Sequence, residues 1–398
     1  MRFLFTCISG YSHFYNVVPL AFAARERGHE VAFSSAPEIA PGVEAAGFRL
    51  LPSGPGRLRM RKEILRSHSA EISEDIRDWR VGARMFGDVA LRLRWKELHT
   101  VVNDFRPDAI ISESLELAGP LVARLRGLPH FFLSIGPYYA DSITQVWQRA
   151  APLFREHAGP GITLSDIVEP YIEVCPPALQ TPEGKAITTT LPAGIRAYHG
   201  EGGSQPPDGG RDAHPQVLIT FGTVSNGAIS LLHESAARLG RMGMRVVMTL
   251  GPQGWFDWSS PSGGTAATSM GDNVRVVRYV PLNAELPATS VLIHHGGSNT
   301  MRAAIEHSVP TLVIPQGAEQ YRNAELIEEC GLGRMLLPSE VTPESVAEHV
   351  SALLDDADTA ERLAKVRRSW LAMPPSTDTI DDIERRCAQT TPRKGWTT

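Results

Sequence analysis

A seven-residue turn constrains this sequence more than any other feature. A short apolar run at residues 291–293 precedes it, and an amphipathic run at residues 301–306 follows it. This order predicts a buried strand, a glycine turn and the start of a helix, which together present backbone N–H groups to an anion. Gly296 and Gly297 are expected to adopt positive φ and to allow close approach to the backbone. The turn consists of His294, His295, Gly296, Gly297, Ser298, Asn299 and Thr300.

Side chains of this turn add further hydrogen-bond donors. His295 can donate from an imidazole nitrogen, and Ser298, Asn299 and Thr300 supply hydroxyl and amide groups. The turn therefore predicts a diphosphate site. A second interpretation stays open, because Ser and Asn also cap helices that bind no phosphate.

The next strand of the chain favours the phosphate interpretation. Residues 309–315 are apolar between two prolines and predict a short buried strand, which Glu319 and Gln320 follow. In an open α/β sheet, ligands bind at the carboxyl ends of the strands. A carboxylate beside an amide suits vicinal hydroxyls, because the first accepts hydrogen bonds and the second both donates and accepts. Diphosphate and hydroxyl recognition on consecutive strands predict a nucleotide sugar as ligand.

These residues resemble the donor signature of family-1 glycosyltransferases with the GT-B fold. The resemblance is greatest to actinobacterial enzymes that glycosylate polyketides and other natural products. It implies an α/β protein with two doubly wound, Rossmann-like domains facing a central cleft and a C-terminal helix crossing back to the first domain. Glu319 stands where the family usually has Asp, which leaves the sugar open. The matching positions are residues 295–300, Pro310, Pro315, Gln316, Glu319, Gln320, Asn323 and Ala324.

The pattern of the chain fits two such domains. Predicted strands alternate with helices in both halves, which favours parallel sheets, and residues 199–215 between them are rich in Gly, Pro, Asp and Ser. We predict an acceptor-binding domain at residues 1–200, a linker at 201–214, a nucleotide-sugar domain at 215–374 and a C-terminal helix at 375–398 that packs on the first domain. The expected strands include residues 3–8, 30–34, 48–51, 107–112, 129–133, 216–221, 244–250 and 274–279, and the tail helices are residues 342–354, 358–371 and 377–388.

Two titratable residues follow predicted strands in the first half. His13 lies just past the strand at residues 3–8, and the resemblance places the general base here, with Ser12 and Pro19 matching the pattern. An imidazole suits this role because its ordinary pKa lies near neutral pH. Glu113 stands where the family often has the acid that orients the base, whereas Asp108 begins its strand at the opposite edge. The alternative for Glu113 is an acid in the first turn of a helix, stabilised by the helix dipole.

Other site residues are expected in both halves. The resemblance gives Thr223 a second phosphate contact and places Val280 where backbone groups hold the nucleotide base. Trp79, in the basic segment at residues 57–99, and Tyr138 and Tyr139, after the strand at 129–133, are candidates for the wall that binds a flat apolar acceptor. A simpler interpretation of the basic segment is a set of amphipathic helices with core aromatics.

Composition limits the partners and the cellular compartment. The net charge of −5 argues against nucleic acid. Four cysteines without a CxxC pair predict reduced thiols in the cytoplasm, and no apolar run approaches the length of a bilayer span. No acidic cluster ends a strand of the donor half, so we predict no metal and no cofactor beyond the sugar nucleotide. The acidic run at residues 355–358 predicts a helix cap, and the sequence allows a homodimer.

The sequence thus predicts an inverting glycosyltransferase that moves a (deoxy)sugar from a dTDP- or UDP-linked donor to a small apolar natural-product aglycone. His13 takes the proton of the acceptor, and the turn with Thr223 holds the leaving diphosphate. Two alternatives stay open. One is a sugar-nucleotide 2-epimerase of the same fold, and the other is a non-catalytic protein that binds a sugar nucleotide or activates a partner.

Overall fold

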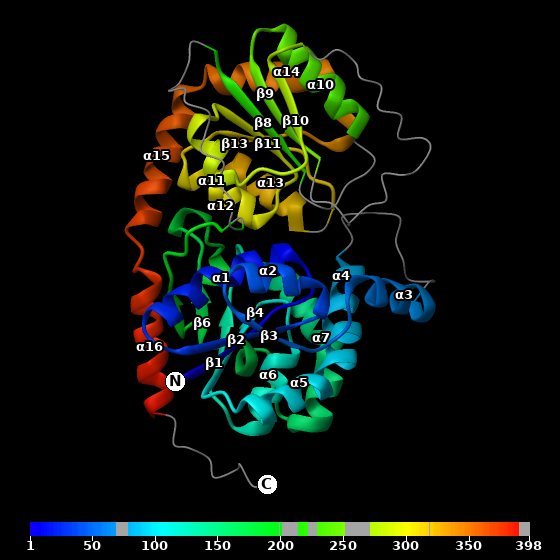
Figure 1. Cartoon of the computed structure of the whole chain (residues 1–398), viewed down its shortest axis with the longest axis vertical. Helices are drawn as coiled ribbons and strands as arrows, with labels where there is room; N and C mark the ends of the chain where they lie inside the picture. Colours follow the sequence, from blue (N-terminus) through cyan, green and yellow to red (C-terminus); the bar gives the residue numbers. More distant parts are fainter. Residues whose placement is uncertain are drawn as a thin grey trace. The chain divides into compact units, whose positions relative to one another are not determined.

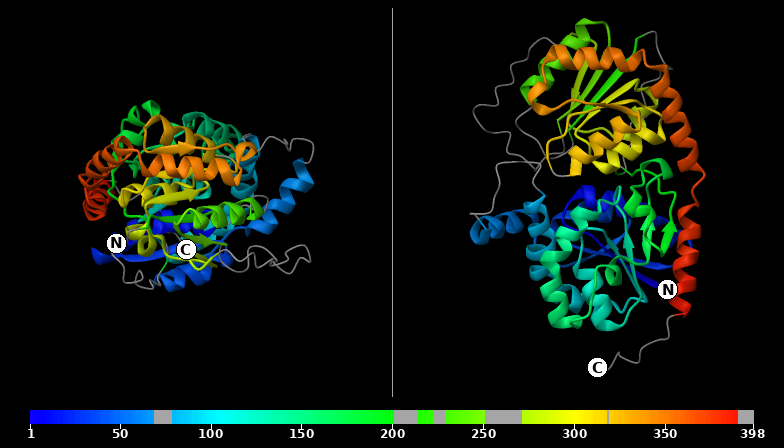
Figure 2. Two further views of the ribbon diagram at one scale, coloured as in Figure 1. Left: turned by 90° about the horizontal axis from the view of Figure 1, so that it is seen from above. Right: turned by 180° about the vertical axis from the view of Figure 1, so that it is seen from behind.

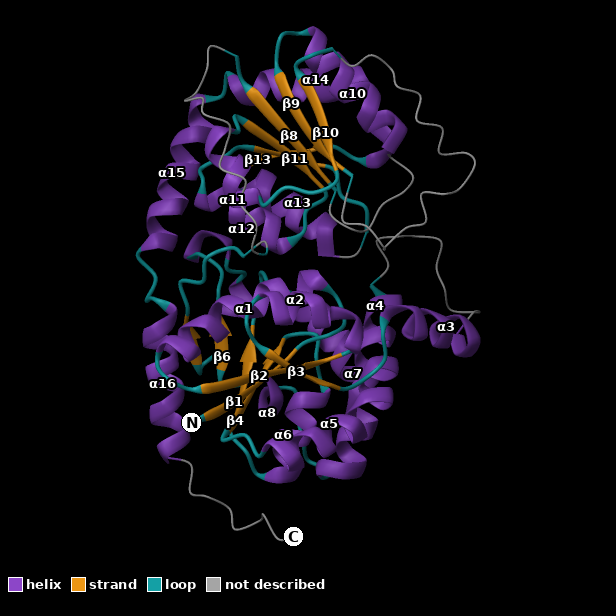
Figure 3. Cartoon of the chain, viewed as in Figure 1, coloured by secondary structure: helices purple, strands orange, loops and turns teal. Residues whose placement is uncertain are grey.

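A computed structural model describes residues 1–68, 79–198, 200, 214–221, 229–250, 271–317 and 319–389. They belong to two compact units, unit 1 with residues 1–200 and 369–398 and unit 2 with residues 201–368. Each unit contains one parallel sheet with helices on both faces (Figures 1 and 3). The predicted linker at 201–214 lies outside the described residues except for residue 214.

The sheet of unit 1 has seven strands in the order β3-β2-β1-β4-β5-β6-β7, and each adjacent pair is parallel. Its central strands are apolar on both faces, as a parallel sheet covered by helices requires. The strand order reverses between β1 and β4, and such a switch point is where open α/β sheets bind ligands. The strands are β1 (Arg2–Thr6), β2 (Glu30–Ser35), β3 (Arg49–Pro52), β4 (Ala109–Glu113), β5 (His130–Leu133), β6 (Tyr171–Glu173) and β7 (Thr190–Pro192).

Helices of unit 1 bury one apolar core on each face of the sheet. The basic segment at residues 57–99 forms amphipathic helices where it is described, and its aromatic residues pack on one of these cores, as the simpler interpretation predicts. The helices are α1 (Tyr11–Glu26), α2 (Ala40–Ala45), α3 (Arg57–His68), α4 (Arg80–Arg84), α5 (Leu91–Phe105), α6 (Ala118–Arg126), α7 (Ala140–Ala158), α8 (Ser165–Val168), α9 (Pro182–Lys185) and α16 (Ser376–Gln389), with short 3₁₀ turns η1 (Pro37–Ile39) and η4 (Pro177–Leu179) and a π-helical turn η3 (Met85–Ala90).

The last helix of the described residues, α16, belongs to unit 1. α16 lies beside α1 at the edge of this unit (red in Figures 1 and 2). Ile380 and Ile383 of α16 are fully buried in the core that α1 covers. Asp381 pairs with Arg27 at 2.8 Å, next to the end of α1.

Unit 2 has a six-stranded parallel sheet in the order β10-β9-β8-β11-β12-β13, so its switch point lies between β8 and β11. Its strands are β8 (Gln216–Thr220), β9 (Arg245–Thr249), β10 (Val274–Val277), β11 (Val291–His294), β12 (Thr311–Val313) and β13 (Gly333–Met335). Its helices are α10 (Ile229–Arg241), α11 (Leu282–Glu285), α12 (Ser298–Glu306), α13 (Glu319–Glu329), α14 (Pro343–Leu354) and α15 (Ala357–Leu371), which runs on into unit 1, with 3₁₀ turns η5 (Leu286–Ala288) and η6 (Pro338–Glu340).

Most predicted elements are confirmed within two or three residues, and the differences have local causes. β1 ends at Thr6 rather than at residue 8, because the Ile8 N–H donates to a side chain instead of a neighbouring strand. β12 is shorter than the predicted strand at 309–315, since the flanking Pro310 and Pro315 have no N–H for a ladder.

The four cysteines are free thiols. Within the described part of the chain, no helix is both long and apolar enough to cross a bilayer.

Candidate active site

His13 and Glu113 lie together at the switch point of unit 1. His13 is on the first turn of α1, which follows β1, and Glu113 is the last residue of the adjacent β4. His13 Nδ1 is 3.0 Å from Glu113 Oε1. The structure thus brings together the two residues that the sequence proposed as base and orienting acid.

The carboxyl group of Glu113 is fully buried and ionised. The Ile8 N–H donates to Oε1 at 3.1 Å and the Leu115 N–H to Oε2 at 2.9 Å. Burial alone would raise the pKa of Glu113, but the neighbouring His13 and these hydrogen bonds hold the pKa below its ordinary value. The alternative for Glu113, an acid in the first turn of a helix, is wrong, because α6 begins only at Ala118. A carboxylate facing Nδ1 favours the tautomer that carries its proton there, which leaves Nε2 to accept one.

Small and aromatic residues shape the space around the imidazole. Gly10 has φ +152°, and a Cβ there would lie 3.3 Å from His13 Cδ2. On another side, the Phe86 ring of η3 lies 6.1 Å from the His13 ring, and the Trp79 ring lies 6.0 Å from Phe86. The His13 side chain remains 18% exposed. Trp79, a predicted acceptor residue, is therefore joined to the candidate base through Phe86.

Tyr138 and Tyr139, the other predicted acceptor residues, follow β5, one strand beyond β4. The Tyr138 ring packs edge-on against Tyr171 with 5.6 Å between the ring centroids. Its carbonyl oxygen accepts a hydrogen bond from the Thr181 hydroxyl at 2.6 Å. Both tyrosines are partly exposed. They lie at the same sheet edge as Glu113.

The glycine turn occupies the corresponding switch point of unit 2, directly after β11. Gly296 has φ +90°, and a Cβ there would lie 2.8 Å from the carbonyl oxygen of Gln320, so both conformation and packing require glycine. The prediction of positive φ is wrong for Gly297, which has φ −65°. A Cβ at Gly297 would lie 2.7 Å from His295 Nε2, so this glycine makes room for the imidazole.

One N–H group of the turn is used inside the protein. The Gly296 N–H donates to His294 Nδ1 at 3.1 Å, so the phosphate donors expected from this turn begin after Gly296. Burial lowers the pKa of His294 to about 3, with a smaller contribution from His295, and the buried imidazole is neutral. Asn323 of α13 supports the same turn by donating to the Gly296 carbonyl at 2.7 Å and the Ser298 hydroxyl at 3.3 Å.

The start of α12 has the properties of an anion site. α12 begins at Ser298, and no side chain of the described residues caps it. The first N–H groups of a helix, here including Ser298, Asn299 and Thr300, have no intrahelical partner and lie at the positive end of the dipole. Burial lowers the pKa of His295 to about 4, against a hydrogen bond to the Thr220 backbone, and its buried Nδ1 has no partner among the described residues. A phosphate oxygen would accept hydrogen bonds from the first N–H groups of α12.

The predicted sugar contacts lie close to this turn, since Gln320 packs against Gly296. Glu319 and Gln320 begin α13, and Glu319 is half-buried. Gln320 is 8% exposed, and its Oε1 accepts a hydrogen bond from the Gln316 N–H at 2.9 Å. Its amide NH₂ is therefore the group suited to a sugar hydroxyl. Val280 is buried between β10 and α11, and Thr223 lies outside the described residues.

Comparison with known proteins supplies the family. Residues 22–222 match the model of the erythromycin biosynthesis protein CIII-like N-terminal domain, and residues 260–385 match the model of the corresponding C-terminal domain. The two matches together span most of the chain. The chain belongs to the erythromycin biosynthesis protein CIII-like family.

Curated relatives of this CIII-like chain are glycosyltransferases. The 3-alpha-mycarosylerythronolide B desosaminyl transferase of Saccharopolyspora erythraea is 26% identical, over 98% of this chain and 99% of its own. The aclacinomycin-T 2-deoxy-L-fucose transferase of Streptomyces galilaeus is also 26% identical, over 98% and 97%. The L-demethylnoviosyl transferase of Streptomyces niveus is 30% identical over 84% and 85%.

Solved structures agree with this family. The glycosyltransferase SnogD from Streptomyces nogalater has a TM-score of 0.76 and 25% identity, covering 97% of the CIII-like chain and 99% of its own. SsfS6 from Streptomyces sp. SF2575, complexed with thymidine diphosphate, has a TM-score of 0.78 at 24% identity, covering 97% and 99%. The CIII-like chain is therefore a glycosyltransferase with the GT-B fold, as its sequence predicted.

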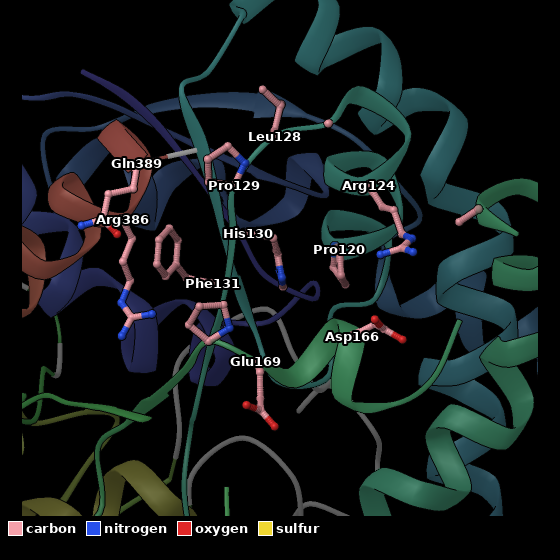
Figure 4. Close-up of a pocket in the computed structure, with 13 residues that line it drawn as sticks. Pro120, Arg124, Leu128, Pro129, His130, Phe131, Asp166, Glu169, Arg386 and Gln389 are labelled. Carbon is pink, nitrogen blue, oxygen red and sulfur yellow. The ribbon is translucent and has the colours of Figure 1, made fainter. Parts of the chain in front are cut away.

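A cavity of about 630 Å³ lies at the amino ends of strands β5 and β6 of unit 1 (Figure 4). His130 at the amino end of β5, Arg124 of α6 and Arg386 of α16 line it. The candidate base lies at the carboxyl ends of parallel strands, so this cavity is separate from it. None of the predicted site residues of the CIII-like chain lines this cavity.

The described part of the CIII-like chain also has a charged helix cap and a buried ion pair outside the predicted site. No cluster of three His, Cys, Asp or Glu side chains there could hold a metal ion. Asp356 accepts a hydrogen bond from the Thr359 N–H at 3.0 Å and caps α15, which confirms the helix cap predicted for residues 355–358. Glu116 and Arg94 form a buried pair behind β1 that the sequence analysis missed. The only signal was a second acid three residues after Glu113.

Proposed function

We propose that this protein is an inverting glycosyltransferase that transfers a deoxysugar from a dTDP- or UDP-linked donor to a small apolar aglycone. The observation that carries the proposal is the pairing of His13 with the buried Glu113 at 3.0 Å, at a ligand-binding switch point. We assign the acceptor to residues 1–200, the donor to residues 215–374 and the helix of residues 375–398 to the acceptor half.

The chemistry follows from the tautomer that Glu113 favours. His13 Nε2 takes the proton of an acceptor hydroxyl as its oxygen attacks the anomeric carbon, and Glu113 stabilises the imidazolium that forms. The new C–O bond replaces the bond to the diphosphate, which leaves with the electron pair from the opposite face of the sugar. The N-terminus of α12, His295 and Thr223 hold the charge of the leaving nucleoside diphosphate.

The substrate class rests on the relatives and on the aromatic residues. One relative is named as a 2-deoxy-L-fucose transferase. Others are the erythronolide mycarosyltransferase of Saccharopolyspora erythraea and the aklavinone 7-beta-L-rhodosaminyltransferase of Streptomyces galilaeus. A thymidine diphosphate complex of a structural neighbour supports a dTDP-linked donor. Trp79, Tyr138 and Tyr139 would contact the flat aglycone, while Val280 would lie beside the nucleotide base and Glu319 with Gln320 beside the sugar. The free thiols favour the reducing cytoplasm.

Donor binding and turnover test the function directly. In a panel of nucleotide sugars, the true donor at a hundred times its Kd should stabilise the protein by about 2.7 kcal/mol, which a thermal shift detects. Without an acceptor, the protein should slowly release nucleoside diphosphate and free sugar from that donor. Stabilisation without any release would favour the non-catalytic binder, and appearance of a 2-epimer would favour the epimerase.

Chelation tests the metal-independent mechanism. We expect the rate to survive EDTA, because the N–H groups at the α12 N-terminus can supply the hydrogen bonds that stabilise the leaving diphosphate. The measurement is the initial rate before and after chelation, followed by addition of Mg²⁺ or Mn²⁺. Complete loss with EDTA and recovery with either ion would overturn this mechanism.

A further inference from the structure

Arg94 forms hydrogen bonds with residues at the carboxyl ends of three strands of unit 1, including β1, which leads to His13. This α5 side chain is only 3% exposed. Its Nη1 donates to the Cys7 carbonyl at 2.6 Å, its Nη2 to the Ser34 carbonyl at 2.6 Å and its Nε to the Ser53 hydroxyl at 3.2 Å. These acceptors lie at the carboxyl ends of β1, β2 and β3. One guanidinium therefore fixes the sheet edge from which the His13 loop leaves.

Glu116 is the charged partner of Arg94 and is equally buried. Its Oε1 lies 3.7 Å from Arg94 Nη1 and accepts from the Ala118 N–H at 2.8 Å. Its Oε2 accepts from the Gly119 N–H at 2.9 Å and from the Thr6 hydroxyl at 2.5 Å. The carboxylate of Glu116 thus accepts hydrogen bonds from three donors. Glu116 therefore ties the start of α6 to the end of β1.

Two charge pairs thus hold three consecutive residues at the end of β1. Glu116 binds the Thr6 hydroxyl, Arg94 binds the Cys7 carbonyl, and Glu113 binds the Ile8 N–H while it faces His13. We propose that Arg94, with Glu116, is a positioning residue for the His13 base. This proposal rests on the proposed function, since it gives His13 the role of base.

The surrounding packing is built for this pair. Gly54 has φ +85°, and a Cβ there would lie 2.8 Å from Arg94 Cγ. A Cβ on Gly119 would lie 2.8 Å from Glu116 Oε2 and 1.9 Å from the Ser112 hydroxyl. Buried ion pairs are often no more stabilising than apolar residues of the same size. A contribution to the geometry and charge at His13 explains the pair better than stability does.

The pair also places two opposite charges at the end of β1, the strand that leads to His13. Without Arg94, the Glu116 carboxylate would favour the imidazolium form of His13, and without Glu116, the guanidinium would disfavour it. Burial raises the pKa of Cys7 to about 12, so this thiol stays neutral in the range of interest. The titratable or charged groups on the elements around His13 include Glu113 on β4, Glu116 after β4, Arg94 on α5, Cys7 after β1, Tyr11 on α1, Glu38 on η1 and Asp88 on η3.

Opposite single substitutions test the charge balance. In the pH profile of kcat/KM, Arg94→Met should move the acid limb to higher pH and Glu116→Gln should move it to lower pH, each by about 0.5–1 unit. The double variant removes both charges and should return the limb to its original place. Arg94→Lys keeps the charge but loses the planar fork, so it should lower kcat and leave the limb unmoved. Arg92→Met, an exposed arginine two residues away on α5, is the matched control.

A second readout does not depend on activity. The ring of His13 can be titrated by NMR in histidine-labelled protein, with its signal identified by its loss in His13→Gln. The ring pKa should shift in opposite directions in the two single variants. Shifts in the same direction, or no shift in either variant, would overturn the positioning role. If the ring shifts as expected while the kinetic limb does not follow it, the proposed base fails and the positioning role stands.

Discussion

Replacing His13 with alanine should lower kcat by roughly two to four decades while the affinity for the donor stays nearly unchanged. The imidazole lies 3.0 Å from a buried carboxylate and is the proposed acceptor of the substrate proton, whereas the proposed donor contacts belong to unit 2. Steady-state kinetics with the aglycone give kcat, and calorimetric titration with the nucleoside diphosphate gives the Kd.

A matched histidine separates this effect from general damage to unit 1. His157 on α7 is partly exposed, and His157→Ala should leave both quantities close to those of the wild type. A His13→Ala protein that loses donor binding but keeps normal single-turnover chemistry would contradict the assignment of His13 as base.

His295→Ala and Glu319→Ala should separate recognition of the diphosphate from recognition of the sugar. His295→Ala should weaken binding of both the nucleoside diphosphate and the nucleotide sugar by about 1.5–3 kcal/mol, the cost of a lost hydrogen bond to a charged group. Glu319→Ala should leave the affinity for the diphosphate unchanged, because this ligand has no sugar. It should instead lower kcat/KM and change the preferred sugar, since buried hydroxyls would lose their partner.

The contrast between the two variants is the measurement that decides. Calorimetry gives the Kd of the nucleoside diphosphate and the Kd of the nucleotide sugar for each of the two variants, which are the four values to compare. His307, which follows the C-terminal end of α12, gives a matched histidine control, and His307→Ala should leave the Kd unchanged. Equal losses of diphosphate affinity in the two site variants would make Glu319 structural and withdraw its role in sugar recognition.

Sequence reasoning succeeded where a local pattern determines the structure. Apolar runs that alternate with helices predicted most strands of the two parallel sheets and the strand ends at which His13 meets Glu113. The short strands β6, β7 and β13 and the order of the strands in each sheet were not predicted. The C-terminal helices were also predictable, because proline and capping residues mark their ends. Family and fold followed from one dense motif, whose spacing is short enough to recognise in a single sequence.

Contacts between distant segments could not be predicted in the same way. Arg94 binds groups at the ends of three strands, and only the packed fold brings those strands to one guanidinium. At Gly297 the expected positive φ was wrong, since the reason for glycine is the neighbouring imidazole of His295 rather than the backbone. The use of the Gly296 N–H by His294 was likewise hidden, because a sequence does not show side-chain direction.

The place of α16 has a consequence for synthesis on the ribosome. All seven strands of unit 1 have been made once Pro192 leaves the exit tunnel, yet the core beside α1 still lacks Ile380 and Ile383. The apolar surface that Ile380 and Ile383 cover therefore stays exposed on the nascent chain until unit 2 has been translated. In a fragment of residues 1–200, this surface would remain exposed. We expect the fragment to form inclusion bodies unless α16 is supplied as a separate peptide.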